Sequence, residues 1–162
     1  MAFFPIFIDL SDKTVVVAGG GVIAERRIRT ILPFAGRLVV IAEAVSDSLQ
    51  RFLDQLDGSG RVIVHRRKFE MEDIDGAFMV LACTDDRELN SRIMAECRVR
   101  GILGNNASDK ENCDFFFPGL IHRDPVVIGI TSGGQDHRLV KELRIRTEET
   151  VEKVFRRVER HQ

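Results

Sequence analysis

The feature that most constrains the fold is a run of three glycines between a strand pattern and a helix pattern. Residues 14–18 form a continuous apolar run rich in Val, which is typical of a buried strand, and residues 22–32 carry the apolar spacing of a helix. Gly19, Gly20 and Gly21 lie between them, so a tight turn is expected there. Residues 38–42 read as a second buried strand, which completes a strand–helix–strand unit within about 30 residues.

The same alternation continues along the chain. Helices are predicted at 46–56 and 87–100, strands at 61–65, 77–82, 103–105, 115–117 and 126–131, and a terminal helix from 135 onward. This order predicts an α/β fold, with a Rossmann-like dinucleotide-binding domain at residues 1–112. Residues 113–162 are expected to form a small β-containing dimerisation and substrate-cleft segment that ends in the helix, whose apolar stripe favours a homodimer.

Each small residue of the turn has a physical role in a dinucleotide fingerprint. Gly19 permits the tight turn, Gly21 lets the backbone approach a pyrophosphate, and Ala24 lets the helix pack closely on its strand. Unpaired N–H groups at the start of the helix favour phosphate. Glu43 follows the second strand at the spacing of the acidic residue that binds ribose hydroxyls and repels a 2′-phosphate, which favours NAD over NADP. The alternative is an ordinary glycine turn with a solvated Glu43.

Residues 82–86 follow a strand pattern, so they belong at the carboxyl edge of the sheet, where such folds bind ligands. Thr84 is a candidate for contact with a cofactor. The alternative is that Asp85 or Asp86 simply caps the next helix.

Charge and cysteine content exclude several classes. The chain has 24 Lys and Arg against 25 Asp and Glu, so it lacks the basic excess of a nucleic-acid-binding protein. It shows neither a secretory signal nor a membrane-length apolar run, and we expect a cytoplasmic protein. Three cysteines without C-x-x-C spacing favour buried, reduced thiols, and no permanent metal site is indicated.

Several blocks in order resemble the precorrin-2 dehydrogenase family, which includes the amino-terminal module of siroheme synthase. They are Pro5-Ile6-Phe7, the segment from Gly19 to Arg26, Thr84-Asp85-Asp86 with Asn90, the segment from Asp114 to Pro118, and Ser132-Gly133-Gly134. The resemblance covers about residues 3–146. It implies NAD-dependent oxidation of precorrin-2 to sirohydrochlorin, in some members Fe²⁺ insertion, and a homodimer. It also places cofactor contacts at Val22, Ile23, Glu43, Ala44 and the segment Cys83, Thr84 and Asp85.

The resemblance implies a catalytic carboxylate in an Asn-x-x-Asp pattern, from which this chain departs. Counting back from Asp114 puts Ser108 at that position, whereas counting forward from Asn106 puts Asp109 there. We favour Asp109 because a serine hydroxyl is a poor base without help. If Asp109 points away from the substrate, iron insertion is the more doubtful activity.

A tetrapyrrole rich in carboxylates needs cations and N–H donors in its cleft. His122 and Arg123 could supply the charge, and Ser132, Gly133 and Gly134 could supply backbone N–H groups, although a solvated surface and a plain turn are the alternatives. Related chains commonly continue into a small helical domain, which we expect to be missing here. The rival functions are a nucleotide-sensing regulatory domain of the potassium-transport type and a family member that binds NAD or tetrapyrrole without turnover.

Overall fold

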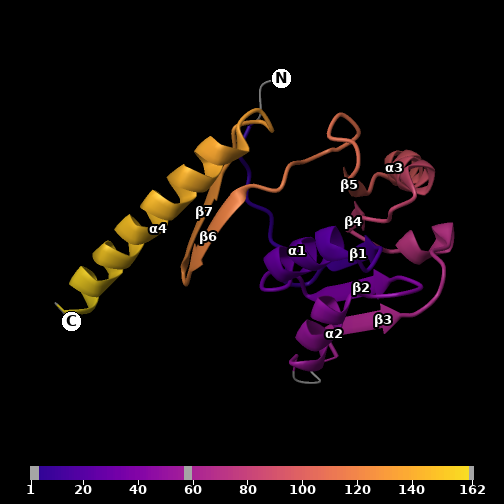
Figure 1. Ribbon diagram of the computed structural model, residues 1–162, viewed down its shortest axis with the longest axis horizontal. Helices are drawn as coiled ribbons and strands as arrows, with labels where there is room; N and C mark the ends of the chain where they lie inside the picture. The colour runs from indigo at the N-terminus through magenta and orange to yellow at the C-terminus, as the bar shows by residue number, and fades with distance from the viewer. Residues whose placement is uncertain (1–3, 57–59, 161–162) are drawn as a thin grey trace. The chain divides into compact units, whose positions relative to one another are not determined.

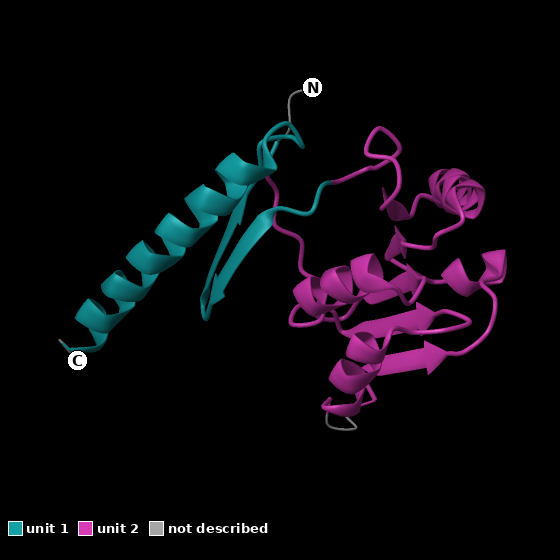
Figure 2. Cartoon of the chain, in the orientation of Figure 1, with its two compact units in different colours: residues 1–4, 116–162 teal, residues 5–115 magenta. Residues whose placement is uncertain are grey.

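The computed structural model describes residues 4–56 and 60–160 and divides into two compact units (Figure 2). Pro5–Phe115 form the larger unit, and the described residues from Phe116 onward, with Phe4, belong to the smaller one. Each unit has its own sheet.

The larger unit is built on a parallel sheet of five strands (Figure 1). The strands are β1 (Thr14–Ala18), β2 (Arg37–Ile41), β3 (Val62–His65), β4 (Met79–Ala82) and β5 (Leu103–Asn106), in the order β3-β2-β1-β4-β5. Val15 pairs with Leu38 on one side and Met79 on the other. The strand order reverses direction between β1 and β4, which is the switch point where doubly wound folds bind ligands. The expected α/β Rossmann-like class is therefore confirmed.

Among the described residues, three α-helices lie on the connections between these strands. They are α1 (Val22–Ile31), α2 (Asp47–Asp54) and α3 (Arg87–Arg100). Right-handed crossovers put α1 and α2 on one face of the sheet and α3 on the other, because the chain moves in opposite directions from the switch point. The central strands are thus covered on both faces, which explains their unbroken apolar sequence.

The core between the sheet and α3 shows why these residues form strands. Val16 and Ala18 of β1 and the matching residues of β4 pack against Ile93 and Cys97 of α3. Both α3 side chains are fully buried. Burying an aliphatic side chain of this kind contributes roughly 1.5–3 kcal/mol.

Short polar side chains fix the helix starts. Ser46 accepts a hydrogen bond from the Leu49 amide at 3.1 Å, and Asp86 accepts one from the Leu89 amide at 2.9 Å. Asp86 is the N-cap of α3, so the expected capping role falls on this residue. Gly101 ends α3 in the left-handed conformation, with φ of 69°.

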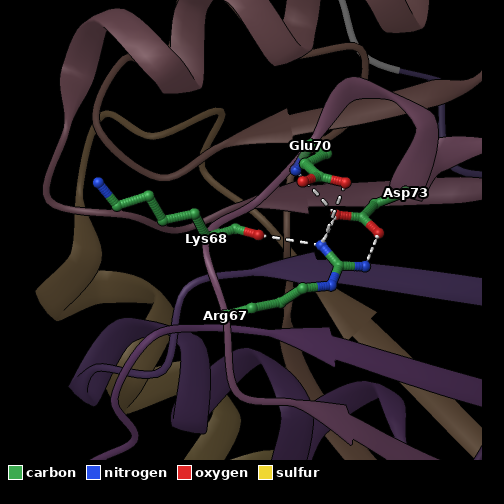
Figure 3. A network of polar contacts seen from close by, with 4 residues as sticks. All are labelled: Arg67, Lys68, Glu70 and Asp73. Atoms are coloured by element: carbon green, nitrogen blue, oxygen red, sulfur yellow. Dashed lines mark hydrogen bonds and ion pairs between the residues drawn. The ribbon is translucent and has the colours of Figure 1, made fainter.

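A short 3₁₀ helix, η1 (Met71–Ile74), lies on the connection from β3 to β4 and is held by an ion pair (Figure 3). The Arg67 guanidinium donates to both carboxylate oxygens of Asp73. Asp73 Oδ2 also accepts a hydrogen bond from the Glu70 amide at 2.8 Å. The Arg67 hydrogen bonds hold the pKa of the Asp73 carboxyl below its usual value.

The smaller unit contains a hairpin and a long helix. Strands β6 (Gly119–Arg123) and β7 (Val126–Ile130) are antiparallel, with a cis peptide bond between Asp124 and Pro125, and α4 (His137–Glu159) packs beside β6 (Figure 1). Val140 of α4 lies close to Gly119 of β6. A Cβ added at Gly119 would lie 2.8 Å from Val140 Cγ1.

The prediction of a strand at residues 115–117 is wrong. The ladder begins at Gly119, which pairs with Ile130, the last residue of β7. Pro118 stands directly before the ladder and has no N–H to donate. The apolar run of Phe residues therefore precedes the strand.

Candidate functional site

The glycine turn after β1 is shaped by close backbone contacts on two sides. Gly19 has φ of 111°, and a Cβ there would lie 2.5 Å from the Cys83 carbonyl oxygen. A Cβ at Gly20 would lie 2.4 Å from the Ala44 carbonyl oxygen. The turn therefore fits between the loops that follow β4 and β2, and only glycine allows this approach.

The loop after β2 is fastened to this turn by hydrogen bonds. The Ser46 amide donates to the Gly20 carbonyl at 2.8 Å. Glu25, nearly buried on α1, accepts from the Ser48 hydroxyl at 2.8 Å and from Arg29 at 2.9 Å. These hydrogen bonds lower the pKa of Glu25, so the carboxylate is the form that holds the loop. Sequence reasoning missed Glu25, because an acidic residue on a helix usually indicates a solvated face.

In contrast, the start of α1 is open. Gly21 is the N-cap and has no side-chain cap, and nothing lies within 4 Å of where its Cβ would be. Val22 is 78% exposed and Ile23 is 44% exposed, whereas Ala24 is fully buried. A helix N-terminus with free amides and room for close approach suits a pyrophosphate. These residues therefore fit a dinucleotide.

Glu43 and Ala44 follow β2 and are both exposed at the same carboxyl edge. Glu43 thus lies after the second strand, at the position where dinucleotide-binding folds carry an acidic residue. The position of Glu43 just after β2 is the one that its spacing from the glycine turn predicts.

On the other side of the switch point, Thr84 is joined to α3. The buried Asn90 side chain donates to the Thr84 carbonyl at 2.9 Å and accepts from the Thr84 hydroxyl at 2.7 Å. The adjacent Cys83 is buried and Asp85 is exposed. Asn90 was part of the family resemblance, but its position on a helix gave no sign that it would bind this loop.

The two catalytic candidates have different surroundings. The Ser108 hydroxyl lies 2.7 Å from Asn106 Oδ1 and 3.2 Å from Asn90 Nδ2. One carboxylate oxygen of Asp109 accepts from the Glu111 amide at 3.1 Å, in a local turn. Both residues are exposed and follow β5 at the carboxyl edge. Ser108 thus belongs to the network that reaches Thr84, and Asp109 supplies the ionisable group beside it.

Cys83 and Cys113, the cysteines near this edge, keep their thiol protons and are therefore poor nucleophiles. All three are free, and burial raises the pKa of Cys83 to about 11. Burial also raises the pKa of Cys113, whose sulfur lies 3.2 Å from the Asn106 amide. Cys113 therefore helps to close the loop after β5. Cys83 and Cys97 are buried as expected, and Cys113 is partly buried.

The predicted substrate-binding residues all lie in the smaller unit. Arg123 pairs with Glu159 at 3.0 Å and with Glu152 at 3.5 Å, and it stacks on Phe155 of the same helix. His122 is exposed. The Arg123 guanidinium therefore links β6 to α4, and these contacts occupy N–H groups that a substrate carboxylate would otherwise use.

The turn before α4 has an internal structure of its own. The Ser132 hydroxyl accepts from the Asp136 amide at 2.9 Å, and the Gly133 amide donates to Thr131 Oγ1 at 3.0 Å. Gly133 and Gly134 both have positive φ. The hydrogen bonds of Ser132 and Gly133 thus serve the turn, as the alternative interpretation anticipated.

Within residues 4–56 and 60–160, no group of three His, Cys, Asp or Glu side chains is gathered as a metal site requires. Nor does any helix in that part of the chain have the length and apolarity to span a bilayer.

The fold and the open glycine turn define a dinucleotide-binding protein. The chain belongs to the family described as putative NAD(P)-binding, whose model matches residues 6–119. It is 35% identical to siroheme synthase 1 of Serratia proteamaculans over 148 residues, which are 91% of this chain and 30% of that protein. It is 39% identical to the probable multifunctional siroheme biosynthesis protein HemA of Ruminiclostridium josui, over 85% of this chain and 26% of that protein. The expected resemblance to siroheme-forming proteins is confirmed.

The fold also resembles a solved structure, that of SirC, a precorrin-2 dehydrogenase. The TM-score is 0.78 at 24% identity, and the match covers 91% of this chain and 70% of that one. This match concerns the fold alone. The chain spans less than a third of the length of the two relatives named above.

Proposed function

We propose that this chain is an NAD-dependent dehydrogenase that oxidises precorrin-2 to sirohydrochlorin. The observation that carries the proposal is the open, uncapped start of α1 at Gly21, beside an exposed Glu43, in a chain similar to siroheme synthases. Each turnover removes a hydride and a proton from the tetrapyrrole, and NAD⁺ accepts the hydride when it is bound.

The residues of the larger unit divide the remaining work. The α1 N-terminus binds the pyrophosphate through its amides, and Glu43 accepts hydrogen bonds from the adenosine ribose and disfavours a 2′-phosphate. We assign Thr84, whose carbonyl accepts a hydrogen bond from Asn90, to contact with the nicotinamide half of the cofactor. Asp109 is the proton acceptor, since it is the ionisable group of the two candidates after β5.

The proposal includes a homodimer formed through the smaller unit. Four apolar side chains of α4 are 42–51% exposed: Leu139, Leu143, Val154 and Val158. They recur at helical spacing, and no residue of α4 is buried among those described. A second copy is the simplest partner for such a stripe. Size-exclusion chromatography with light scattering tests this, and a monomer at all concentrations contradicts it.

The test of function is an anaerobic absorbance assay with precorrin-2 and NAD⁺. We expect one NADH for each sirohydrochlorin formed. Asp109→Asn keeps an oxygen for the Glu111 amide but removes the base, so the rate should fall by about 10²–10⁴-fold. Glu111→Gln removes a neighbouring carboxylate as a matched control and should keep the wild-type rate.

Each result has a distinct meaning. A rate unchanged in Asp109→Asn moves the base elsewhere. NAD binding without turnover in the wild type favours a nucleotide-sensing module or a non-catalytic relative. Failure of the wild type to bind NAD overturns the proposal.

A further inference from the structure

The orientation of the Asn90 side-chain amide is fixed by backbone groups that cannot exchange roles. The Thr84 carbonyl only accepts, so the group 2.9 Å away must be Nδ2. The Thr84 amide only donates, so the atom 3.2 Å away must be Oδ1. Asn90 is fully buried, with Nδ2 also directed at the Ser108 hydroxyl.

Asn106 is fixed by the same logic. The Ser108 amide donates to the Asn106 side chain at 2.9 Å, so the atom facing it is Oδ1. The same Oδ1 lies 2.7 Å from the Ser108 hydroxyl. Asn106 is 3% exposed and its Nδ2 is among the described buried atoms that have no hydrogen-bond partner, so the bond from the Ser108 amide sets the orientation of this side chain.

The hydroxyl of Ser108 is therefore polarised. It has one proton, which it donates to Asn106 Oδ1, and two lone pairs, one of which receives the Asn90 Nδ2 proton. The second lone pair has no partner among the bonds described, and Ser108 is exposed at the carboxyl edge of the sheet. With its bond to Asn106 in place, Ser108 therefore offers an incoming ligand an acceptor.

We propose that Ser108 accepts a hydrogen bond from an N–H group of the bound ligand, and that Asn90 is the positioning residue that sets this polarity. The inference rests on the proposed function. A carboxylate is repelled at this point because both groups are acceptors, so Ser108 selects for N–H.

Two ligands of the proposed reaction carry such a group. The nicotinamide carboxamide has N–H donors, and so do the pyrrole rings of the tetrapyrrole. Ligands of doubly wound folds lie outside the carboxyl ends of the strands near the switch point. Thr84 follows β4 at that point and Ser108 follows the next strand, β5.

The first experiment measures dissociation constants for NAD⁺ and for sirohydrochlorin with the wild type and with Ser108→Ala. Ser91→Ala is the matched control, because this α3 serine donates only to the Arg87 carbonyl of its own helix in the bonds described. We expect Ser108→Ala to weaken one ligand by roughly three- to tenfold, as for the loss of a neutral hydrogen bond. Ser91→Ala should change neither.

The two sources of the N–H group give different results. If it is the carboxamide, NAD⁺ binds more weakly to Ser108→Ala than to the wild type. Nicotinic acid adenine dinucleotide carries a carboxylate in place of the carboxamide, so its dissociation constant should differ less between the two proteins. If it is a pyrrole, sirohydrochlorin binds more weakly and NAD⁺ does not. If Ser108→Ala binds both ligands like the wild type, the inference is wrong, while wild-type turnover leaves the proposed function standing.

A double-mutant cycle tests Asn90. Asn90→Asp removes the donor to Ser108, so it should weaken the same ligand in the wild-type background and have little further effect in Ser108→Ala. Effects that simply add would show that Asn90 acts only on the fold. Thermal melting checks each variant, and Asn90→Ser replaces Asn90→Asp in the cycle if the latter does not fold.

Discussion

A methyl group added at Gly19 and one added at Gly21 should have opposite consequences, although the two glycines are two residues apart. At Gly19 the new Cβ would lie 2.5 Å from the Cys83 carbonyl oxygen and 2.7 Å from its carbon. These are backbone atoms of the loop after β4, which cannot turn aside as a flexible side chain could. At Gly21 nothing lies within 4 Å.

The size of the effect at Gly19 follows from two contributions. A side chain in left-handed backbone costs roughly 1–2 kcal/mol, and φ of 111° is no easier. Displacing packed backbone adds roughly 1–3 kcal/mol. Gly19→Ala should thus lower the free energy of unfolding by about 2–5 kcal/mol. At about 2–4 °C per kcal/mol for a chain of this size, the Tm falls by roughly 4–20 °C.

Gly21→Ala should instead leave the protein without ligand close to wild type. Its φ of −82° suits any residue, and replacing a glycine N-cap costs at most about 1 kcal/mol. The methyl would project into the space where a pyrophosphate must approach the amides of α1. We therefore expect NAD affinity to fall by about tenfold or more, which corresponds to roughly 1.4 kcal/mol or more.

Thermal unfolding without ligand and calorimetric titration with NAD⁺ separate the two effects. The reasoning fails if Gly19→Ala melts with the wild type, because the backbone contact would then carry no cost. It also fails if Gly21→Ala binds NAD⁺ as tightly as wild type, because the open helix start would then not be the phosphate site.

Three further results are expected. Glu43→Ala should raise the affinity for NADP relative to NAD by about fivefold, as removal of one nearby like charge predicts, and an unchanged ratio in parallel titrations would contradict the ribose assignment. Ile28→Ala, at a fully buried position, should lower the free energy of unfolding in urea by about 2–5 kcal/mol, while Val99→Ala, 82% exposed, should change it by no more than about 0.5 kcal/mol. The Asp73 carboxyl has a lowered pKa because of its hydrogen bonds from Arg67, so its contribution is present above the unfolded value of about 3.9 and is lost as the pH falls through the lower folded value. Asp73→Asn should therefore destabilise the protein at pH 7 and much less near pH 2, and an equal difference in urea unfolding at both pH values would refute this.

Local sequence was enough to predict most of the larger unit. The Val-rich run of β1, the glycine turn and the helix after it are specified by residues that are neighbours in the chain. Helix α3 was predicted at residues 87–100, where the structure has it, and its caps in the structure are Asp86 and Gly101, residue types that favour helix ends. The terminal helix was likewise expected from its apolar spacing.

The smaller unit shows where local patterns mislead. Three consecutive Phe residues indicated a strand at 115–117, yet strand β6 begins at Gly119. A strand exists only where a partner can complete its hydrogen bonds, and β7 ends opposite Gly119. An apolar pattern indicates that side chains prefer burial, but it does not predict how long the neighbouring strand is.

The sequence by itself determined the glycine turn, the acidic residue after β2 and the family resemblance, because these depend on residue type and short spacing. Only the tertiary structure decided that Asn90 of α3 meets both Thr84 after β4 and Ser108 after β5. The separations are 6 and 18 residues, and no periodicity predicts which side chain will satisfy a distant backbone group. A buried amide must find its partners wherever the folded chain brings them, so the polarity of Ser108 is a property of the fold.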